Sequence, residues 1–250
     1  MNFHTATMLG TIHNVAACAM LFLLAGCSRD PLSLDAMPHA KSVISYHRAE
    51  KPVTRRIIQL DDWHFVPRDA FAADLRSQDP AVTADAIEDA YLRHLADVEC
   101  VQAEQLLVLR HLAKRFEVDR IYLEGFAVEE IDDLAAMLVA LDAGDADRET
   151  RLQLGAAGQM WCDDEIAHVL PAESRASLAA AKPTNGNLAA ATSDQRHKTI
   201  VATIGEAPTV IVVLGAAHDL TNVIPEGVEY VRVRTMLVDE EVANMGGGRR

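Results

Sequence analysis

The sequence predicts an α/β fold: a single domain with a mostly parallel or mixed sheet flanked by helices. The chain has 250 residues, 50% of them hydrophobic, which suits one sizeable core rather than two. Apolar runs within Val53–Leu60, Arg120–Leu123 and Val210–Leu214 predict core strands, and helix-period segments separate them. A strand–helix–strand–helix order implies parallel pairing through right-handed crossovers.

The charge balance excludes some classes of partner. Asp and Glu number 37 against 23 Lys and Arg, which gives a formal net charge of −14. No basic stripe is present to neutralise phosphates, so the sequence argues against nucleic acid as a partner. The same balance argues against binding of the folded body to an anionic membrane surface.

The first 27 residues contain no Asp, Glu, Lys or Arg, and Val15–Ala25 is an apolar run of signal-peptide length. The run ends in Leu-Ala-Gly-Cys at residues 24–27, which resembles the lipobox of bacterial lipoprotein signal peptides. The resemblance implies cleavage before Cys27 and a lipid on its thiol. The domain would then be anchored to a membrane of the bacterial cell envelope and face the periplasm or the exterior. The alternatives are an uncleaved signal anchor and an apolar start from a misassigned initiation codon.

The remaining chain divides into three parts. Residues 28–52, with Pro31 and Pro38, predict a tether in which Val43–Tyr46 could pair with the sheet. Residues 53–240 form the predicted domain, and 241–250 a flexible tail. Beyond the lipobox, Cys100 and Cys162 are too few for a disulfide framework, and Cys100 is expected to be a buried small residue on a helix.

The longest helix-period segment is Thr83–Arg115. Thr83 suits the N-cap, and basic residues gather near the end, as the helix dipole prefers. Apolar residues recur at steps of four and three, which predicts one face against a core. The residues of that face are Ile87, Tyr91, His94, Val98, Val101, Gln105, Val108 and Leu112.

Further helices are predicted at Glu129–Leu141, Leu152–Met160, Ile166–Leu170 and Ser193–Glu206. The stretch 142–195 has the weakest pattern; it could cap a site as a lid or merely decorate the fold. The first of these helices has an expected apolar side of Ile131, Leu134, Ala135, Leu138 and Leu141. In Val228–Met236, two valines alternate with Arg232 and Arg234, which predicts an edge strand with one wet face.

Ionisable side chains follow three of the predicted strands. Asp61, Asp62 and His64 follow the first, Glu124 ends the second, and His218 and Asp219 follow the late strand Val210–Leu214. If these strands are parallel neighbours, the side chains meet at one edge of the sheet, where open α/β sheets usually place ligands.

Two chemistries suit this edge. His64, Glu124 and His218 make a reasonable site for a divalent metal ion with open positions for water. They equally make a metal-free pair in which a histidine is the general base and Glu124 orients it. Arg196, in the first turn of its helix, would supply a fixed positive charge for an oxyanion or a substrate carboxylate. A structural alternative remains for each group: a capping or core role for His218, and a turn at Asp61 and Asp62 with His64 in solvent.

The motifs resemble those of the superfamily of TraB/Tiki, erythromycin-esterase and ChaN-like proteins over about Ile57–Pro225. The matching pieces are Asp-Asp-Trp-His at 61–64, Tyr-Leu-Glu-Gly at 122–125, Arg196, Val-Leu-Gly-Ala-Ala-His at 213–218, and the helix from His94 to Gln105. The resemblance carries over onto His64, Glu124, Arg196 and His218. Asp62 stands where the family often has Glu, and Asp61 replaces a glycine.

The resemblance implies three activities: metal-dependent peptide cleavage, ester hydrolysis, and haem or iron binding. The leading hypothesis is a metal-assisted or His/Glu-dependent hydrolase of an ester or peptide bond, acting on an unknown small molecule or peptide. Glu124 or His64 would activate water, His218 would bind metal or share the base work, and Arg196 would stabilise developing charge. The alternative is a non-catalytic haem- or iron-binding lipoprotein, although no tyrosine matches a haem-ligand motif. A third possibility is a degenerate domain that keeps the fold for envelope interactions.

Overall fold

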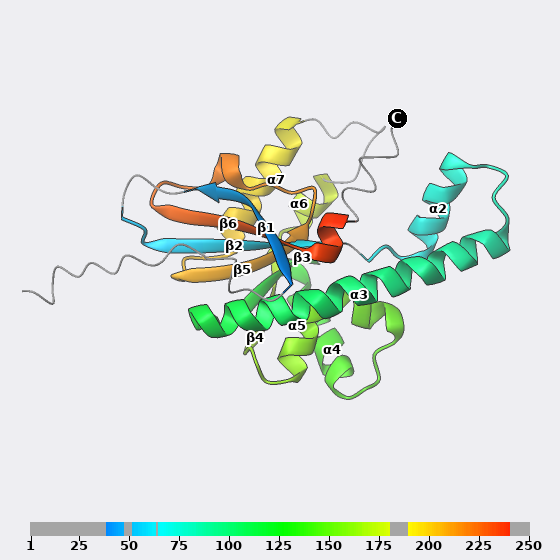
Figure 1. Cartoon of the computed structure of the whole chain (residues 1–250), viewed down its shortest axis with the longest axis horizontal. Coiled ribbons are helices and arrows are strands. Elements are labelled where there is room, and N and C mark those ends of the chain that lie inside the picture. The colour runs from blue at the N-terminus through cyan, green and yellow to red at the C-terminus, as the bar shows by residue number, and fades with distance from the viewer. Residues whose placement is uncertain (1–38, 48–51, 64, 181–189, 241–250) are drawn as a thin grey trace, which may run out of the picture. The chain divides into compact units, whose positions relative to one another are not determined.

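The structure is a computed structural model that describes residues 39–47, 52–63, 65–180 and 190–240. A six-stranded sheet runs in the order β1-β6-β2-β5-β3-β4, and all neighbours are parallel except the antiparallel pair β1–β6 (Figure 1). The predicted α/β fold class is therefore confirmed. The strands are β1 Ala40–His47, β2 Arg55–Asp62, β3 Arg120–Ala127, β4 His168–Glu173, β5 Thr209–Gly215 and β6 Val228–Thr235.

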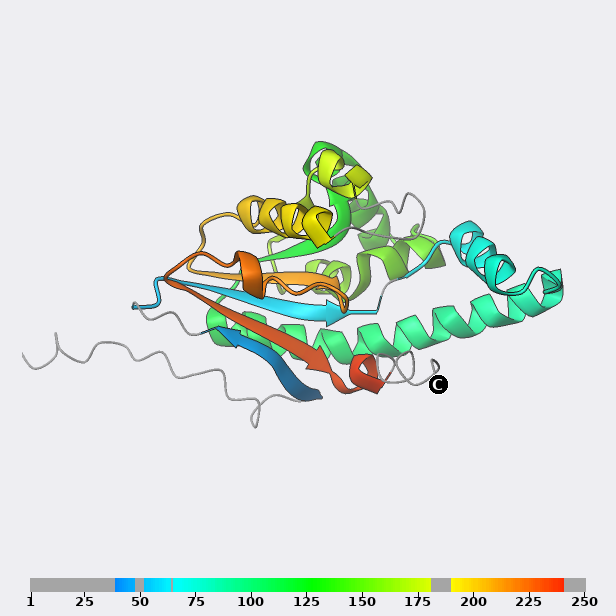
Figure 2. The ribbon, with the colours of Figure 1, turned by 90° about the horizontal axis from the view of Figure 1, so that it is seen from above.

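Helices cover both faces of the sheet, with α3 and α5 on one side and α6 and α7 on the other (Figure 2). The helices are α2 Arg68–Gln78, α3 Ala84–Phe116, α4 Ile131–Asp142, α5 Arg148–Cys162, α6 Arg175–Ala180 and α7 Ala190–Thr203, with short 3-10 turns η2 Val128–Glu130 and η3 Thr221–Val223. Among the described residues, no helix has both the length and the apolar character that a membrane span requires.

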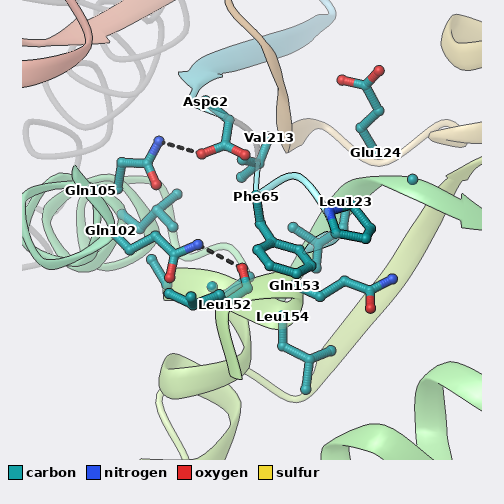
Figure 3. A pocket seen from close by; sticks show the side chains of 16 residues that line it. Asp62, Phe65, Gln102, Gln105, Leu123, Glu124, Leu152, Gln153, Leu154 and Val213 are labelled. Carbon is teal, nitrogen blue, oxygen red and sulfur yellow. Dashed lines mark hydrogen bonds between the residues drawn. The ribbon is translucent and has the colours of Figure 1, made fainter. Parts of the chain in front are cut away.

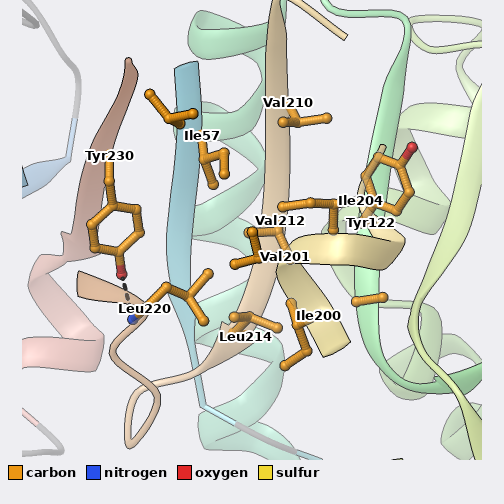
Figure 4. Close-up of a cluster of buried hydrophobic side chains, with 12 residues drawn as sticks. Ile57, Tyr122, Ile200, Val201, Ile204, Val210, Val212, Leu214, Leu220 and Tyr230 are labelled. Carbon is orange, nitrogen blue, oxygen red and sulfur yellow. Dashed lines mark hydrogen bonds between the residues drawn. The ribbon is translucent and has the colours of Figure 1, made fainter. Parts of the chain in front are cut away.

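The central strand β5 is buried on both faces, as its unbroken apolar run predicts. Val210, Val212 and Leu214 pack against Ile200 and Ile204 of α7 in one cluster of the core (Figure 4). Side chains alternate along a strand, so the residues between them face α3 and α5. Both layers of helices thus depend on the same seven residues of β5.

The long helix α3 begins and ends as its sequence predicts. The Thr83 side chain accepts a hydrogen bond from the backbone N–H of Ala86, and the helix ends at Glu117 in the left-handed conformation. The expected apolar face is buried except for His94, which is partly exposed. Cys100 is exposed, contrary to prediction, because it projects beside the stripe of Val98 and Val101 rather than from it.

Three other predictions about elements are wrong. Ile166–Leu170 is not a helix; from His168 it enters the edge strand β4, where Pro171 is tolerated because one side of an edge strand has no pairing partner. In α4, Ile131 and Ala135 are exposed, and the helix is buried mainly through Leu134 and Leu138.

The third correction concerns β6, which is not an edge strand. It lies between β1 and β2, and its Arg232 is only 5% exposed. The alternating arginines can be buried because Asp61, which is fully buried near the end of β2, pairs with both of them. Arg232 Nε lies 2.7 Å from Asp61 Oδ1, and Arg234 Nε lies 2.9 Å from Oδ2. Burial raises the pKa of Asp61, and the two guanidinium groups oppose that rise.

The predicted signal peptide with Cys27, His64, and the tail 241–250 lie outside the described residues. The strand β1 falls within the predicted tether, at the place where Val43–Tyr46 was expected to pair with the sheet.

The Asp61 cluster gives a test of stability. Asp61→Asn leaves two guanidinium groups beside a neutral amide in the interior, and breaking a buried ion pair in this way destabilises a protein by about 3–5 kcal/mol. We expect a loss of that order in chemical denaturation. Asp119→Asn, which removes the exposed partner of Arg120, is the matched control and should leave stability nearly unchanged. Equal effects of the two variants would contradict a special role for Asp61.

Candidate functional site

Four neighbouring parallel strands bring ionisable side chains to the carboxyl edge of the sheet. Asp62 ends β2, Glu124 lies in β3, Glu173 ends β4, and His218 follows β5. The order β2-β5-β3-β4 makes these strands adjacent. The topology therefore brings Glu124 and His218 together, as expected from the sequence, and adds Glu173.

Glu124 projects from an irregularity in β3. Leu123 pairs with Pro171 and Ala127 with Glu173, so residues 124–126 stand opposite Ala172 alone. Such a bulge re-aims a side chain, and Gly125 permits it with φ of +87°. Glu124 Oε2 accepts a hydrogen bond of 2.6 Å from the backbone N–H of Gly215. The carboxylate is thereby fixed against the end of β5.

Arg196 of α7 binds two carboxylates at once. Its Nε and Nη2 donate to the two oxygens of Glu173 at 2.7 and 2.8 Å, and Nη2 also donates to Glu124 Oε1 at 2.5 Å. Its Nη1 lies 3.2 Å from His218 Nε2. A guanidinium group has five N–H donors. Three are used on the two carboxylates, and the Nη1 contact is a hydrogen bond only if His218 Nε2 carries no proton, so one or two remain for a substrate oxygen. The predicted role of Arg196 in holding a substrate anion is restricted accordingly.

Burial and ion pairing act on Arg196 in opposite directions. Desolvation works to lower its pKa, but the hydrogen bonds and negative charges of Glu173 and Glu124 outweigh it, and the pKa is raised. Glu173 itself has no solvent exposure. Arg196 is therefore a permanent cation that compensates two buried carboxylates.

Both ring nitrogens of His218 are engaged. Nε2 lies 2.9 Å from Glu124 Oε1, and Nδ1 lies 3.0 Å from Nε2 of His197. The backbone N–H of His218 donates to the carbonyl of Gly215 at 2.9 Å, and its own carbonyl accepts from Gln59. Burial lowers the pKa of His197, and the neighbouring His218 and Arg196 lower it further. The neutral form of His197 is therefore favoured, and its contact with Nδ1 orients the ring of His218.

Glu173 and His197 belong to this cluster but were not predicted from the sequence. Glu173 ends an apolar run, Val-Leu-Pro-Ala at 169–172, in the way that Glu124 ends Tyr-Leu at 122–123. The signal was present but was obscured when Ile166–Leu170 was interpreted as a helix. His197 directly follows Arg196, and no periodicity distinguishes it from a surface histidine.

A pocket of about 150 Å³ opens beside Glu124, on the side of the sheet covered by α3 and α5 (Figure 3). Asp62 also lines it, and its Oδ1 accepts a 2.9 Å hydrogen bond from Gln105 Nε2. The other walls are mixed: Gln102, Gln105 and Gln153 are polar, and Phe65, Leu109, Leu123, Leu152 and Val213 are among the apolar residues. Acidic and amide residues in a partly apolar hollow at this edge are typical of a binding or catalytic site.

A break in α5 shapes the floor of the pocket. Gly155 has φ of +55° and ψ of −149°, a conformation that is essentially restricted to glycine. Gln102 Nε2 donates a 2.6 Å hydrogen bond to the carbonyl of Leu152 near this break. A side chain inserted into the helical ladder in this way is a recognised cause of a kink.

The predicted divalent metal ion does not fit well between Glu124 and His218. The guanidinium group of Arg196 contacts both side chains, so a cation bound there would meet a fixed positive charge at close range. Within the described residues, no three His, Cys, Asp or Glu side chains gather as a metal-binding group. His64, the third predicted ligand, lies outside those residues, so the metal stays a prediction.

The size of the pocket bears on the alternative prediction that the protein binds haem. The pocket beside Glu124, at about 150 Å³, is below the roughly 300–1,000 Å³ that is usual for drug-sized ligands. A small reacting group fits this volume better than a macrocycle does. Haem binding stays a prediction that the geometry of the described pocket does not favour.

The chain was compared with protein-family models, with curated proteins and with solved structures, and nothing matches it. The fold and the side chains at its carboxyl edge define an α/β protein with a buried Arg–Glu–His cluster beside a small pocket. The functional interpretation rests on that geometry.

The break in α5 leads to a second stability prediction. Gly155→Ala forces a side chain into a glycine-only conformation and places its Cβ 3.1 Å from Gln102 Nε2. We expect a loss of about 1–3 kcal/mol, measured by thermal and chemical unfolding. Gly144→Ala, at another positive φ but with no atom within 4 Å of the added Cβ, separates backbone strain from the contact with Gln102. An unchanged stability of Gly155→Ala would show that the kink relaxes freely.

Proposed function

We propose that this chain is a hydrolase of an ester or peptide bond that depends on Glu124, Arg196 and His218 and needs no metal ion between them. The observation that carries the proposal is the position of Glu124. Glu124 is one of the residues that line the pocket, and its carboxylate is held at the pocket's margin by Arg196, His218 and the backbone of Gly215. Fixed charges around a polar group at a pocket are the usual arrangement of catalytic residues.

In this proposal Glu124 is the general base. A water molecule in the pocket attacks the carbonyl carbon of the substrate, and its proton passes to Glu124. The C–O or C–N bond then breaks, and the leaving group takes the proton back from Glu124. Arg196 and His218 keep the carboxylate oriented, and Asp62 positions the substrate or the water from the other side of the pocket. His64 keeps the role expected from the sequence, as a second candidate for the base.

The resemblance to the erythromycin-esterase and TraB/Tiki superfamily supports the same reaction class. It rests on the residues His64, Glu124, Arg196 and His218, three of which belong to the cluster described above or line its pocket. The substrate is a small molecule or a peptide whose reacting bond fits a hollow of about 150 Å³.

Substitution of Glu124 tests the proposal. Glu124→Gln keeps the size of the side chain and removes the base, so we expect hydrolysis of short esters or peptide amides to fall by about 10²- to 10⁴-fold. The measurement uses the whole chain purified in detergent, with a panel of chromogenic esters and peptides. Glu88→Gln, which removes the exposed partner of Arg68, is the matched control and should keep full activity.

Folding must be separated from catalysis in this experiment. Thermal unfolding of Glu124→Gln identifies a loss of structure. Asp62→Asn changes a pocket residue that takes no part in the Arg196 ion pairs, so it tests the pocket without disturbing them. Full activity of a folded Glu124→Gln variant would contradict the assignment of the base. Activity that is lost on chelation and restored by a divalent ion would favour the metal-assisted hydrolase instead.

We also propose that the protein is a lipoprotein of the cell envelope, anchored through Cys27. The support is the sequence Leu-Ala-Gly-Cys after an uncharged apolar run. A single acyl chain binds a membrane only weakly, so the stable anchor requires more than one chain.

Cys27→Ser gives the corresponding prediction. We expect the wild-type chain to fractionate with membranes and to carry an added lipid mass at Cys27, and the variant to lose both, because the acceptor thiol is absent. Cys100→Ser, which changes an exposed thiol of the domain, should fractionate as the wild type does. An unmodified Cys27 in membrane-bound protein would favour the uncleaved signal anchor.

A further inference from the structure

A second hollow lies beside the candidate active pocket, between α3 and α5. Its volume is about 260 Å³, and it shares Gln102, Leu152, Gly155 and Ala156 with the first pocket. These four residues form the wall between the two hollows. The side chain of Gln102, bound to the carbonyl of Leu152 at 2.6 Å, is the polar part of that wall.

The lining of this second hollow differs from that of the first. The first pocket has two acidic residues, Asp62 and Glu124, and no Lys or Arg among its lining residues. The second has Arg148 and Arg151, three residues apart on α5 and therefore on the same side of the helix. Leu106, Leu141 and Leu152 supply apolar walls. A ligand for this hollow needs an aliphatic body and a negative charge.

The second hollow is lined by more positive than negative side chains. Glu99 takes a paired contact from Arg148, with Nε and Nη2 at 2.7 and 2.9 Å from its two oxygens. Arg151 donates through Nη1 to the carbonyl of Ala146, and it forms no ion pair with a carboxylate among the described residues. The lining thus has two arginines and one carboxylate, and Arg151 interacts with Glu99 and with the neighbouring Asp147 through its charge, without a direct ion pair in the described part of the chain. Its guanidinium group therefore keeps donors for an anionic ligand, in a chain whose formal net charge is −14.

We propose that the hollow between α3 and α5 is a binding subsite for an aliphatic carboxylate, with Arg151 as the residue that recognises the anion. The carboxylate receives charge-assisted hydrogen bonds from the guanidinium group, and the aliphatic body packs on the leucines. This identification of the ligand rests on the proposed function: the ligand is the non-reacting arm of the substrate. The ester or amide bond of the substrate then lies beyond Gln102, beside Glu124. The substrate class is then an ester or amide with an anionic aliphatic arm.

Binding of hexanoate to the whole chain tests the subsite. Isothermal titration in detergent, with a detergent blank, should detect hexanoate binding, and hexanol, which lacks the charge, should bind at least about tenfold more weakly. Arg151→Gln should weaken hexanoate by at least about tenfold. Glu99→Gln should strengthen it, because Arg148 then becomes free to donate to the ligand. Arg120→Gln, which removes an exposed arginine paired with Asp119, is the matched control and should bind as the wild type does.

The outcomes separate this proposal from the hydrolase. Hexanoate binding that Arg151→Gln abolishes supports the subsite, whether or not the Glu124 experiments detect hydrolysis. Hexanoate that fails to bind, that binds Arg151→Gln and wild type equally, or that binds no better than hexanol overturns the subsite and leaves the hydrolase standing. Gln102→Ala adds an independent measurement: removal of the dividing side chain should improve the binding of octanoate relative to hexanoate, and an unchanged ratio counts against two hollows joined through Gln102.

Discussion

The carboxyl edge of this sheet depends on one guanidinium group. Arg196 comes from α7 and binds Glu124 of β3, Glu173 of β4 and His218 after β5, so it ties three neighbouring strands to one helix. Without it, two carboxylates with little or no exposure would lose their guanidinium partner, which is strongly unfavourable in a protein interior. The next residue, His197, reaches the other side of the His218 ring. The packing of α7 on β5 through Ile200 and Ile204 therefore also sets the geometry of the site.

A second buried network follows the same principle on the neighbouring strands. Asp61, the last residue but one of β2, binds Arg232 and Arg234 of β6, and Gln59 donates both to Asp61 and to the carbonyl of His218. The two networks are thus connected through one amide. At this edge of the sheet the buried charges have partners, whereas Arg55 Nε and Nη2 and Arg56 Nη2, at the other end of β2, are buried without a hydrogen-bond partner among the described residues.

The sequence predicted the parts of the fold and of the site that depend on local patterns. Unbroken apolar runs located β2, β3 and β5, and the rule that parallel strands end at one edge led to Glu124 and His218. Prediction from the sequence failed where a partner that is distant in the chain decides whether a side chain is buried. Arg232 and Arg234 alternate with valines as on a solvated face, and only the position of Asp61 in the fold makes that alternation compatible with burial. A short apolar run such as Ile166–Leu170 suits helix or strand equally, and with β4 misassigned, Glu173 could not be recognised as a partner of Arg196.

The position of Arg196 also bears on the chemistry. A carboxylate that is already held by a guanidinium group, an imidazole and a backbone N–H does not have to reorganise when charge develops beside it, which is the main advantage of a preorganised site. The same guanidinium group opposes a metal ion at Glu124 and His218, because the compensating cation is already part of the protein. Glu124 thus separates a fixed, buried cluster from an open pocket. In the proposed hydrolase, that division assigns orientation to Arg196, His218 and Glu173, and leaves contact with a substrate to Glu124 and Asp62.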